Sequence, residues 1–146
     1  MRKIVLLTAV LGVLFLACSN EEDDNTSFKM TCDSESQIVS DEDFSEIDVS
    51  NYRITDIQLD GNCLEVTISS SGCDPEPWEM NLYSLDAFYA VFPYQRAVRV
   101  ELLNDQLCMA VFQKTVSFDL TPFQIEGQNE VPLNIEGWSE QIIYQY

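Results

Sequence analysis

Apolar and polar residues alternate with a period of two over most of the chain after residue 50. Such alternation predicts β-strands that bury one face. Turn-forming residues such as Gly61 and Gly127 separate the runs, and the best helical candidate, residues 85–92, would end at Pro93. We expect an all-β domain, an antiparallel β-sandwich of about seven strands. The apolar members of the runs are Leu64, Val66, Ile68, Trp78, Met80, Leu82, Val98, Val100, Leu102, Phe112, Val116, Phe118, Leu120, Val131, Leu133, Ile135, Ile142, Tyr144 and Tyr146, with Lys114 as a misfit.

The first 17 residues have the pattern of a secretory signal, in which two basic residues precede a run of fourteen mostly apolar ones. That run is too short for a membrane-spanning helix, which needs about 20 apolar residues. It ends in Phe15-Leu16-Ala17-Cys18, which resembles the lipobox of bacterial lipoproteins. The resemblance implies cleavage before Cys18 and a lipid on its thiol, which would attach the protein to a membrane.

Four acidic residues at 21–24 follow the cysteine. The tract resembles the surface-export signal of Bacteroidota-type lipoproteins, and it implies an outer-membrane lipoprotein exposed at the cell surface. Residues 18–50 hold eleven acids, one base and few large apolar side chains. Such a segment cannot offset its ordering entropy by burial. We therefore expect an acidic flexible tether over 18–50 and the β domain over 51–146.

The formal net charge is −18, and removal of the signal would make it more negative. This charge argues against nucleic acid as a partner. Asp41, Glu42, Asp43, Glu46 and Asp48 lack the spacing of a calcium-binding loop, so solvated charge is the favoured interpretation. Histidine is absent, which removes the commonest zinc ligand and general base. We expect no metal and no other cofactor.

Paired carboxylates can hydrolyse glycosides, and the candidates in this chain are Glu65, Glu79, Glu101 and Asp119. Each alternates with core residues and would point outward into solvent, where a carboxyl group is a poor general acid. We therefore expect no enzyme activity.

Four cysteines remain once Cys18 carries lipid, and an even number in an exported domain predicts two disulfides. Cys73 and Cys108 would lie at one end of the sandwich if their strands are neighbours or face each other, because a disulfide needs Cα atoms within about 7 Å. We predict Cys73–Cys108, and Cys32–Cys63 by elimination. Pairing of Cys63 with Cys73 or with Cys108 stays open, since strand order is not known.

The order of features over residues 52–146 resembles an uncharacterised family of small Bacteroidota lipoproteins. The resemblance implies two paired cysteines that flank the middle strands, and it implies no known activity. Relatives often carry a histidine shortly after the first cysteine of this region, which this chain lacks. The residues that carry the resemblance are Ser71-Gly72-Cys73, Trp78-Glu79-Met80-Asn81-Leu82, Pro93, Arg99-Val100-Glu101-Leu102, Cys108-Met109-Ala110 and Ser117-Phe118-Asp119-Leu120-Thr121-Pro122.

Four aromatic residues, Phe88, Tyr89, Phe92 and Tyr94, fall within seven positions. They could form a binding loop for a sugar or a peptide, because aromatic rings offer much contact area at low entropic cost. Packing of an irregular edge strand on the core is the favoured interpretation. For the domain we predict a lipid-anchored, non-catalytic module that binds a glycan, a peptide or a partner protein. The alternative is an inhibitor of secreted proteases or host enzymes.

Overall fold

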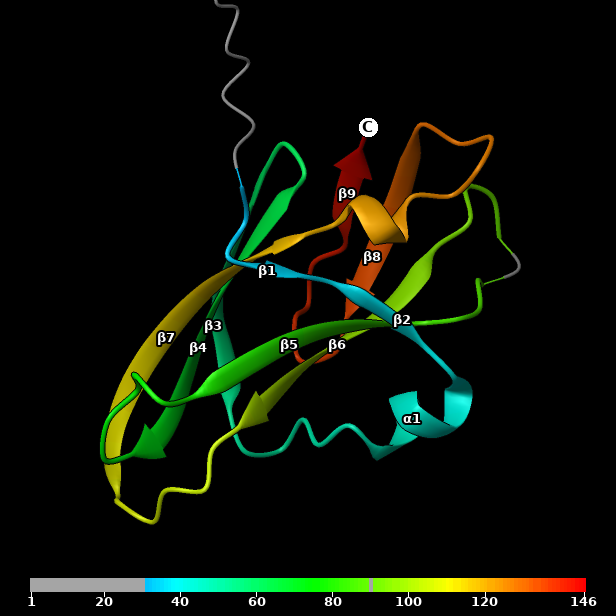
Figure 1. The fold of residues 1–146 in the computed structure, drawn as a ribbon. Coiled ribbons are helices and arrows are strands. Elements are labelled where there is room, and N and C mark those ends of the chain that lie inside the picture. Colours follow the sequence, from blue (N-terminus) through cyan, green and yellow to red (C-terminus); the bar gives the residue numbers. More distant parts are fainter. Residues whose placement is uncertain (1–30, 90) are drawn as a thin grey trace, which may run out of the picture.

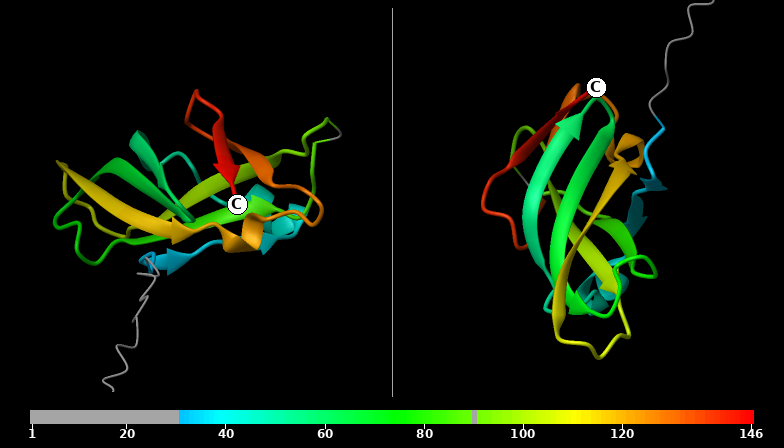
Figure 2. Two further views of the ribbon diagram at one scale, coloured as in Figure 1. Left: turned by 90° about the horizontal axis from the view of Figure 1, so that it is seen from above. Right: turned by 90° about the vertical axis from the view of Figure 1, so that its left-hand side faces the viewer.

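The computed structural model describes residues 31–89 and 91–146, which fold into two packed β-sheets (Figures 1 and 2). One sheet has the strand order β1-β7-β4-β3, and the other has β2-β5-β6-β8-β9. The elements are β1 (Ser34–Glu35), β2 (Gln37–Val39), α1 (Asp41–Glu46), β3 (Arg53–Asp60), β4 (Cys63–Gly72), β5 (Glu79–Leu85), β6 (Arg96–Leu103), β7 (Ala110–Asp119), a short 3-10 helix η1 (Thr121–Phe123), β8 (Glu130–Ile135) and β9 (Ile142–Gln145). The predicted all-β sandwich is confirmed.

The long neighbouring strands pair antiparallel, as expected, in β3–β4, β4–β7, β5–β6 and β8–β9. Three further pairs, β1–β7, β2–β5 and β6–β8, are parallel. The parallel β6–β8 pair arises because β7, the strand between them in sequence, lies in the other sheet. The chain crosses and reverses twice, so β8 returns beside β6 in the same direction. The described residues thus form nine strands instead of about seven, two of them very short.

The expected tether is wrong for residues 31–50, which are folded into the domain. Strand β1 joins the first sheet and β2 joins the second, with Ser36 buried between them. Its hydroxyl donates to the carbonyl oxygen of Asp119 at 2.7 Å. Ser40 caps the N-terminus of helix α1, because its side chain accepts a hydrogen bond from the backbone N–H of Asp43. Backbone pairing at existing sheet edges orders this polar segment, so little apolar burial is needed.

The helical candidate over 85–92 is wrong, because Leu85 ends β5 and the described residues after it form a loop without helical turns. The signal, Cys18 and residues 18–30 of the tether lie outside the described residues. No helix in the described part of the chain is long and apolar enough to cross a membrane.

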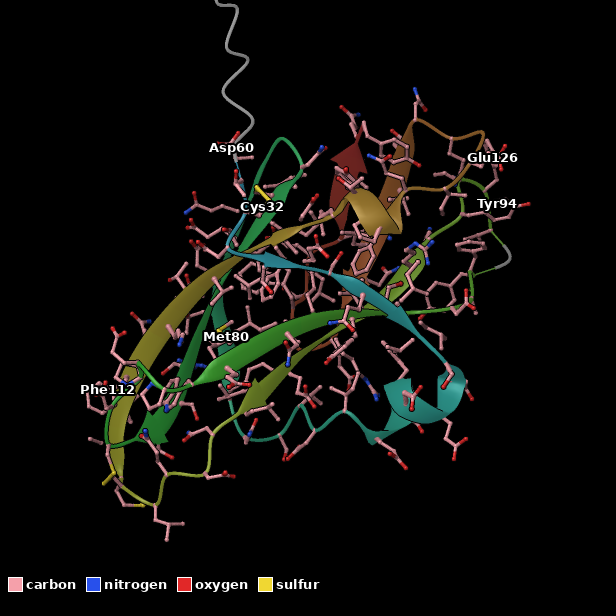
Figure 3. All side chains as sticks on the ribbon, in the orientation of Figure 1. Cys32, Asp60, Met80, Tyr94, Phe112 and Glu126 are labelled. Carbon is pink, nitrogen blue, oxygen red and sulfur yellow. A yellow bond between two sulfur atoms is a disulfide. The ribbon has the colours of Figure 1, made fainter. Side chains whose placement is uncertain are left out.

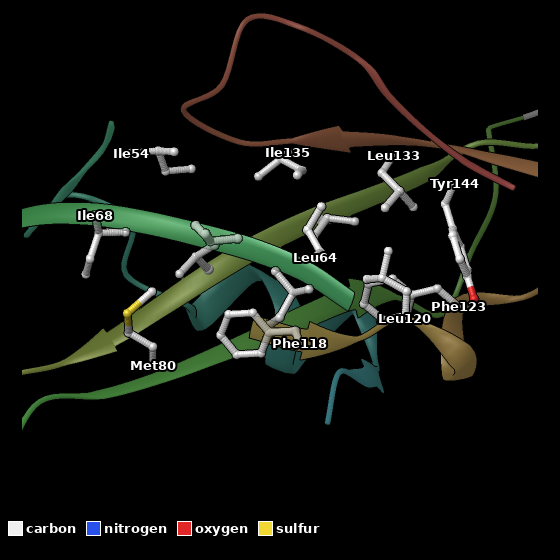
Figure 4. Close-up of a cluster of buried hydrophobic side chains, with 14 of the residues drawn as sticks. Ile54, Leu64, Ile68, Met80, Phe118, Leu120, Phe123, Leu133, Ile135 and Tyr144 are labelled. Carbon is white, nitrogen blue, oxygen red and sulfur yellow. The ribbon is translucent and has the colours of Figure 1, made fainter. Parts of the chain in front are cut away.

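The core lies between the two sheets and is built from the inward positions of the alternating strands (Figure 4). Each fully buried Leu, Val or Phe stabilises the fold by roughly 1.5–3 kcal/mol relative to exposure. The misfit Lys114 is explained by its ammonium group, which donates to the carbonyl oxygens of Pro75, Glu76 and Trp78 in the β4–β5 connection. Lys114 therefore closes the rim of the sandwich. Fully buried members of the core include Leu64, Val66, Ile68, Leu82, Val98, Val100, Phe118, Leu120, Phe123, Val131, Leu133 and Tyr144.

Both predicted disulfides are confirmed. Cys32 bonds to Cys63 at a Cα–Cα distance of 5.6 Å and fixes the segment before β1 to the β3–β4 hairpin (Figure 3). Cys73 bonds to Cys108 at 5.0 Å and joins the β4–β5 and β6–β7 connections. Each bond closes a loop of more than thirty residues, so each stabilises the domain by about 4 kcal/mol in the chain-entropy model.

Candidate binding surface

The β5–β6 loop exposes all four aromatic residues that the sequence brings together. Phe92 is 90 % exposed, and Phe88, Tyr89 and Tyr94 are each about half exposed. The interpretation of an edge strand packed on the core is therefore wrong. The loop projects from the sandwich (Figure 1). The Phe92–Pro93 peptide bond within it is cis.

A buried arginine holds the base of this loop. The guanidinium of Arg96 donates from Nε to the carbonyl oxygen of Phe123 at 2.8 Å and from Nη1 to the Ser84 hydroxyl at 3.4 Å. Its Cζ atom lies 4.7 Å from the centre of the Phe88 ring, and that ring stacks on Tyr94 at 5.7 Å. Burial lowers the pKa of Arg96, yet an arginine stays charged at neutral pH. Charge-assisted hydrogen bonds thus hold Arg96 against η1 and β5, and a cation–π contact connects it to Phe88 of the loop.

Backbone contacts fasten the loop at further points. The N–H of Tyr89 donates to the carbonyl oxygen of Gln95, and the N–H of Tyr94 donates to the side chain of Gln128. In Figure 3, Tyr94 accordingly lies at the same end of the molecule as Glu126, in the connection that leads to β8. These contacts give the aromatic side chains a fixed frame. A fixed frame lowers the entropy that a ligand would have to offset.

A groove of about 350 Å³ lies beside the loop, on the outer face of β6 and β8. Ala97 contributes a small side chain to its lining, opposite Asn134 in the strand register. Tyr89 lines the groove where its backbone meets Gln95, and Phe44 of α1 lines it near Arg99. Two aromatic rings therefore frame a stretch of β6 only a few residues long.

Polar groups in and behind the groove are ordered by one another. Arg99 Nε lies 2.6 Å from a carboxylate oxygen of Glu136, and Arg99 Nη1 donates to the carbonyl oxygen of Phe44 at 2.6 Å. The side chain of Asn134 donates to Gln95 Oε1 at 3.1 Å and accepts from Gln141 Nε2 at 2.9 Å. The groove thus carries a guanidinium, a carboxylate and an amide in set orientations.

The aromatic run itself signals Tyr89, but its neighbours in the groove, Phe44, Arg99, Asn134 and Glu136, were not predicted. Arg99 occupies an outward position in an alternating strand, which is a weak signal at best. Phe44 lies in the segment expected to be a tether, so no pattern in the sequence places it beside β6.

The carboxylates considered for catalysis do not come together as a reacting pair. Glu101 accepts hydrogen bonds from Asn81 at 3.0 Å and from the Tyr83 hydroxyl at 3.4 Å. Asp119 accepts from the backbone and hydroxyl of Thr121. Glu65 and Glu79 are exposed. Within residues 31–89 and 91–146, no three acidic or cysteine side chains are arranged to hold a metal ion.

A second apolar surface lies at the opposite end of β6. It consists of Leu103, Leu107, Met109 and Val111 around the Cys73–Cys108 bond, and we call it the aliphatic strip. Leu107 is 95 % exposed.

No family model matches the chain, and no curated protein matches it in sequence. A protein of unknown function DUF1344 from Bacteroides vulgatus has a similar fold, with a TM-score of 0.53 and 15 % identity over 77 % of this chain and 56 % of that one. A protein from Parabacteroides distasonis whose name relates it to toxins gives a TM-score of 0.46 at 14 % identity, over 77 % of this chain and 60 % of that one. The chain spans less than two thirds of either neighbour. The likeness to the Bacteroides vulgatus protein shows a shared fold.

Proposed function

We propose that this protein is a non-catalytic binding module, held at the cell surface by a lipid on Cys18, which presents the β5–β6 loop to an extracellular ligand. The observation that carries the proposal is the exposure of four aromatic side chains on a loop anchored by the buried Arg96. Exposed apolar patches on a monomer often mark interaction sites. Aromatic residues are also the residue types that dominate binding energy at such sites.

Substitution of the loop tip tests the proposal. The full-length chain is applied to a glycan microarray and to a peptide array, together with Phe92→Ala and the control Leu107→Ala. Both residues are almost fully exposed, so neither change should disturb the fold. We expect at least one probe to bind the wild type and the control but to bind Phe92→Ala about tenfold more weakly or worse. Equal binding by all three proteins would contradict the proposal.

The anchor is tested separately by metabolic labelling with a palmitate analogue. The lipobox-like Phe15-Leu16-Ala17-Cys18 predicts that the wild type is labelled and Cys18→Ser is not. Replacement of residues 21–24 by alanine should keep the label but reduce removal by protease added to whole cells. Unchanged protease removal would show that the acidic tract does not direct surface export.

A further inference from the structure

The groove beside Tyr89 offers two kinds of surface to one ligand. Tyr89 and Phe44 line it with aromatic side chains, and Ala97 contributes a small one. The Phe44 ring stacks on Arg99, whose Cζ lies 4.7 Å from its centre, so the proposal below rests on the Tyr89 ring. Arg99 of β6, Asn134 of β8 and Glu136, which directly follows β8, supply planar polar groups. A sugar ring has the matching construction, because its C–H faces are apolar and its edge carries hydroxyl groups that each donate and accept hydrogen bonds.

Hydrogen-bonding capacity remains in the groove after the internal contacts are counted. Within the described residues, the Tyr89 hydroxyl, the Nη2 group of Arg99 and the second carboxylate oxygen of Glu136 make no hydrogen bond to protein. The internal bonds to Arg99 and Asn134 fix the directions of the groups that would meet a ligand. Such preorganised donors and acceptors fix ligand orientation in small-molecule sites.

The charge of the groove argues against both anionic and cationic ligands. Glu136 neutralises Arg99 at 2.6 Å, so the groove has no uncompensated cation for a phosphate, sulfate or uronate. The formal charge of −18 on the whole chain further opposes an anionic ligand. A cationic ligand would meet the Arg99 guanidinium in the same groove.

We infer that this groove binds a neutral carbohydrate, with a sugar ring against Tyr89 and its hydroxyl groups at Arg99, Asn134 and Glu136. This inference rests on the proposed function, to which it adds the class of ligand. It requires that the ligand contact the groove, whereas the proposed function requires only that the ligand contact the β5–β6 loop.

The test applies the full-length chain to a microarray of neutral glucans, mannans, xylans and galactans beside sulfated and uronate-containing glycans, with a peptide array in parallel. Ala97→Leu fills the groove and Tyr89→Ala removes its ring. Ala110→Leu makes the same enlargement on an exposed position of β7, in the other sheet, and serves as the control. Circular dichroism and thermal unfolding check the fold of every variant, and Tyr89→Ala keeps the test decisive should Ala97→Leu fail to fold.

We expect binding to one or more neutral glycans that falls about tenfold or more in Tyr89→Ala and Ala97→Leu but not in Ala110→Leu. Binding confined to anionic glycans, or neutral-glycan binding unaffected by either groove variant, would overturn the inference. Peptide binding that is lost in Phe92→Ala and kept in Ala97→Leu would leave the proposed function standing and refute the carbohydrate inference. If no glycan or peptide bound more weakly to Tyr89→Ala, Phe92→Ala or Ala97→Leu than to the wild type, both the carbohydrate inference and the proposed function would be refuted.

Discussion

The β5–β6 loop and the aliphatic strip lie at opposite ends of β6, and both expose large apolar side chains, but they are built differently. The loop carries aromatic rings anchored by the buried Arg96 through hydrogen bonds and a ring contact. The aliphatic strip carries Leu and Met side chains on a connection that a disulfide anchors. One end is therefore held by reversible polar contacts, and the other by a covalent bond.

The two ends also use their polar side chains differently. A pocket of similar size lies beside the aliphatic strip, and the two amide side chains that line it, Asn104 and Gln106, bond to the backbone around it. The side-chain oxygen Oε1 of Gln106 accepts from the N–H groups of Cys73 and Asp74, and the side chain of Asn104 donates to the backbone carbonyl oxygen of Ser71. At the loop end, Arg99 and Glu136 keep atoms without a protein partner among the described residues. This difference teaches that exposure of apolar side chains alone does not identify a binding surface.

Loss of the Cys73–Cys108 bond should give the largest effect on the stability of the domain, and its local effect on hydrogen exchange should fall on the end that carries the bond. The double variant Cys73→Ala/Cys108→Ala removes the closure of a 35-residue loop, so we expect a loss of about 4 kcal/mol in the free energy of unfolding. Urea unfolding measures the loss. Hydrogen exchange should speed up at residues 72–79 and 103–111 while residues 86–96 keep their protection. Equal loosening of both ends would show that they are not independent.

The second prediction concerns the anchor of the β5–β6 loop. Arg96→Met removes the cation beneath Phe88 and leaves the buried carbonyl oxygen of Phe123 without its donor. We expect a loss of about 2–4 kcal/mol in the free energy of unfolding, with faster hydrogen exchange at residues 86–95.

Arg99→Met is the matched control for Arg96→Met. Arg99 pairs with Glu136 near the surface, where an ion pair contributes about 0–1 kcal/mol. Equal losses in the two variants would show that Arg96 is not the anchor of the loop.

Gly72→Ala should damage the disulfide end through close packing. A Cβ atom at this position would lie 2.6 Å from Gln106 Oε1 and 2.8 Å from Cζ2 of the buried Trp78. We expect a loss of about 1–3 kcal/mol in the free energy of unfolding, as for other overpacked sites. Ser71→Ala, at the exposed neighbouring position, should stay within about 0.5 kcal/mol of the wild type. A neutral Gly72→Ala would mean that Trp78 and Gln106 can move aside.

The core could be predicted from the sequence because it follows from the two-residue period of the strands, and the disulfides because the cysteines lie at the ends of those strands. Inward positions such as Leu64, Val66 and Ile68 are fully buried, as their alternation predicts. Cys73 and Cys108 meet because β5 and β6, the strands between them in sequence, pair antiparallel and bring both connections to one end.

The groove could not be predicted, because it depends on contacts that leave no periodic signal. Phe44 reaches Arg99 only because the polar strands β1 and β2 join the two sheets and direct the chain into α1. The exposure of the aromatic run was misjudged for a related reason. Arg96 occupies the buried site beneath Phe88, and nothing in the alternation of apolar and polar residues indicates a buried arginine at this position.

The smallest effect on the free energy of unfolding is expected for the most exposed side chains. Variants of such side chains at the two ends therefore compare ligand binding without a change in folding. Phe92 and Leu107 are 90 % and 95 % exposed, so their truncation to alanine removes almost no buried contact. Each variant should unfold within about 0.5 kcal/mol of the wild type in urea. Any difference in ligand binding between the two variants then reports the contact of the side chain with the ligand. A loss above about 1 kcal/mol in Phe92→Ala would instead show that the ring stabilises the loop, and its effect on binding would have to be reassigned to loop order.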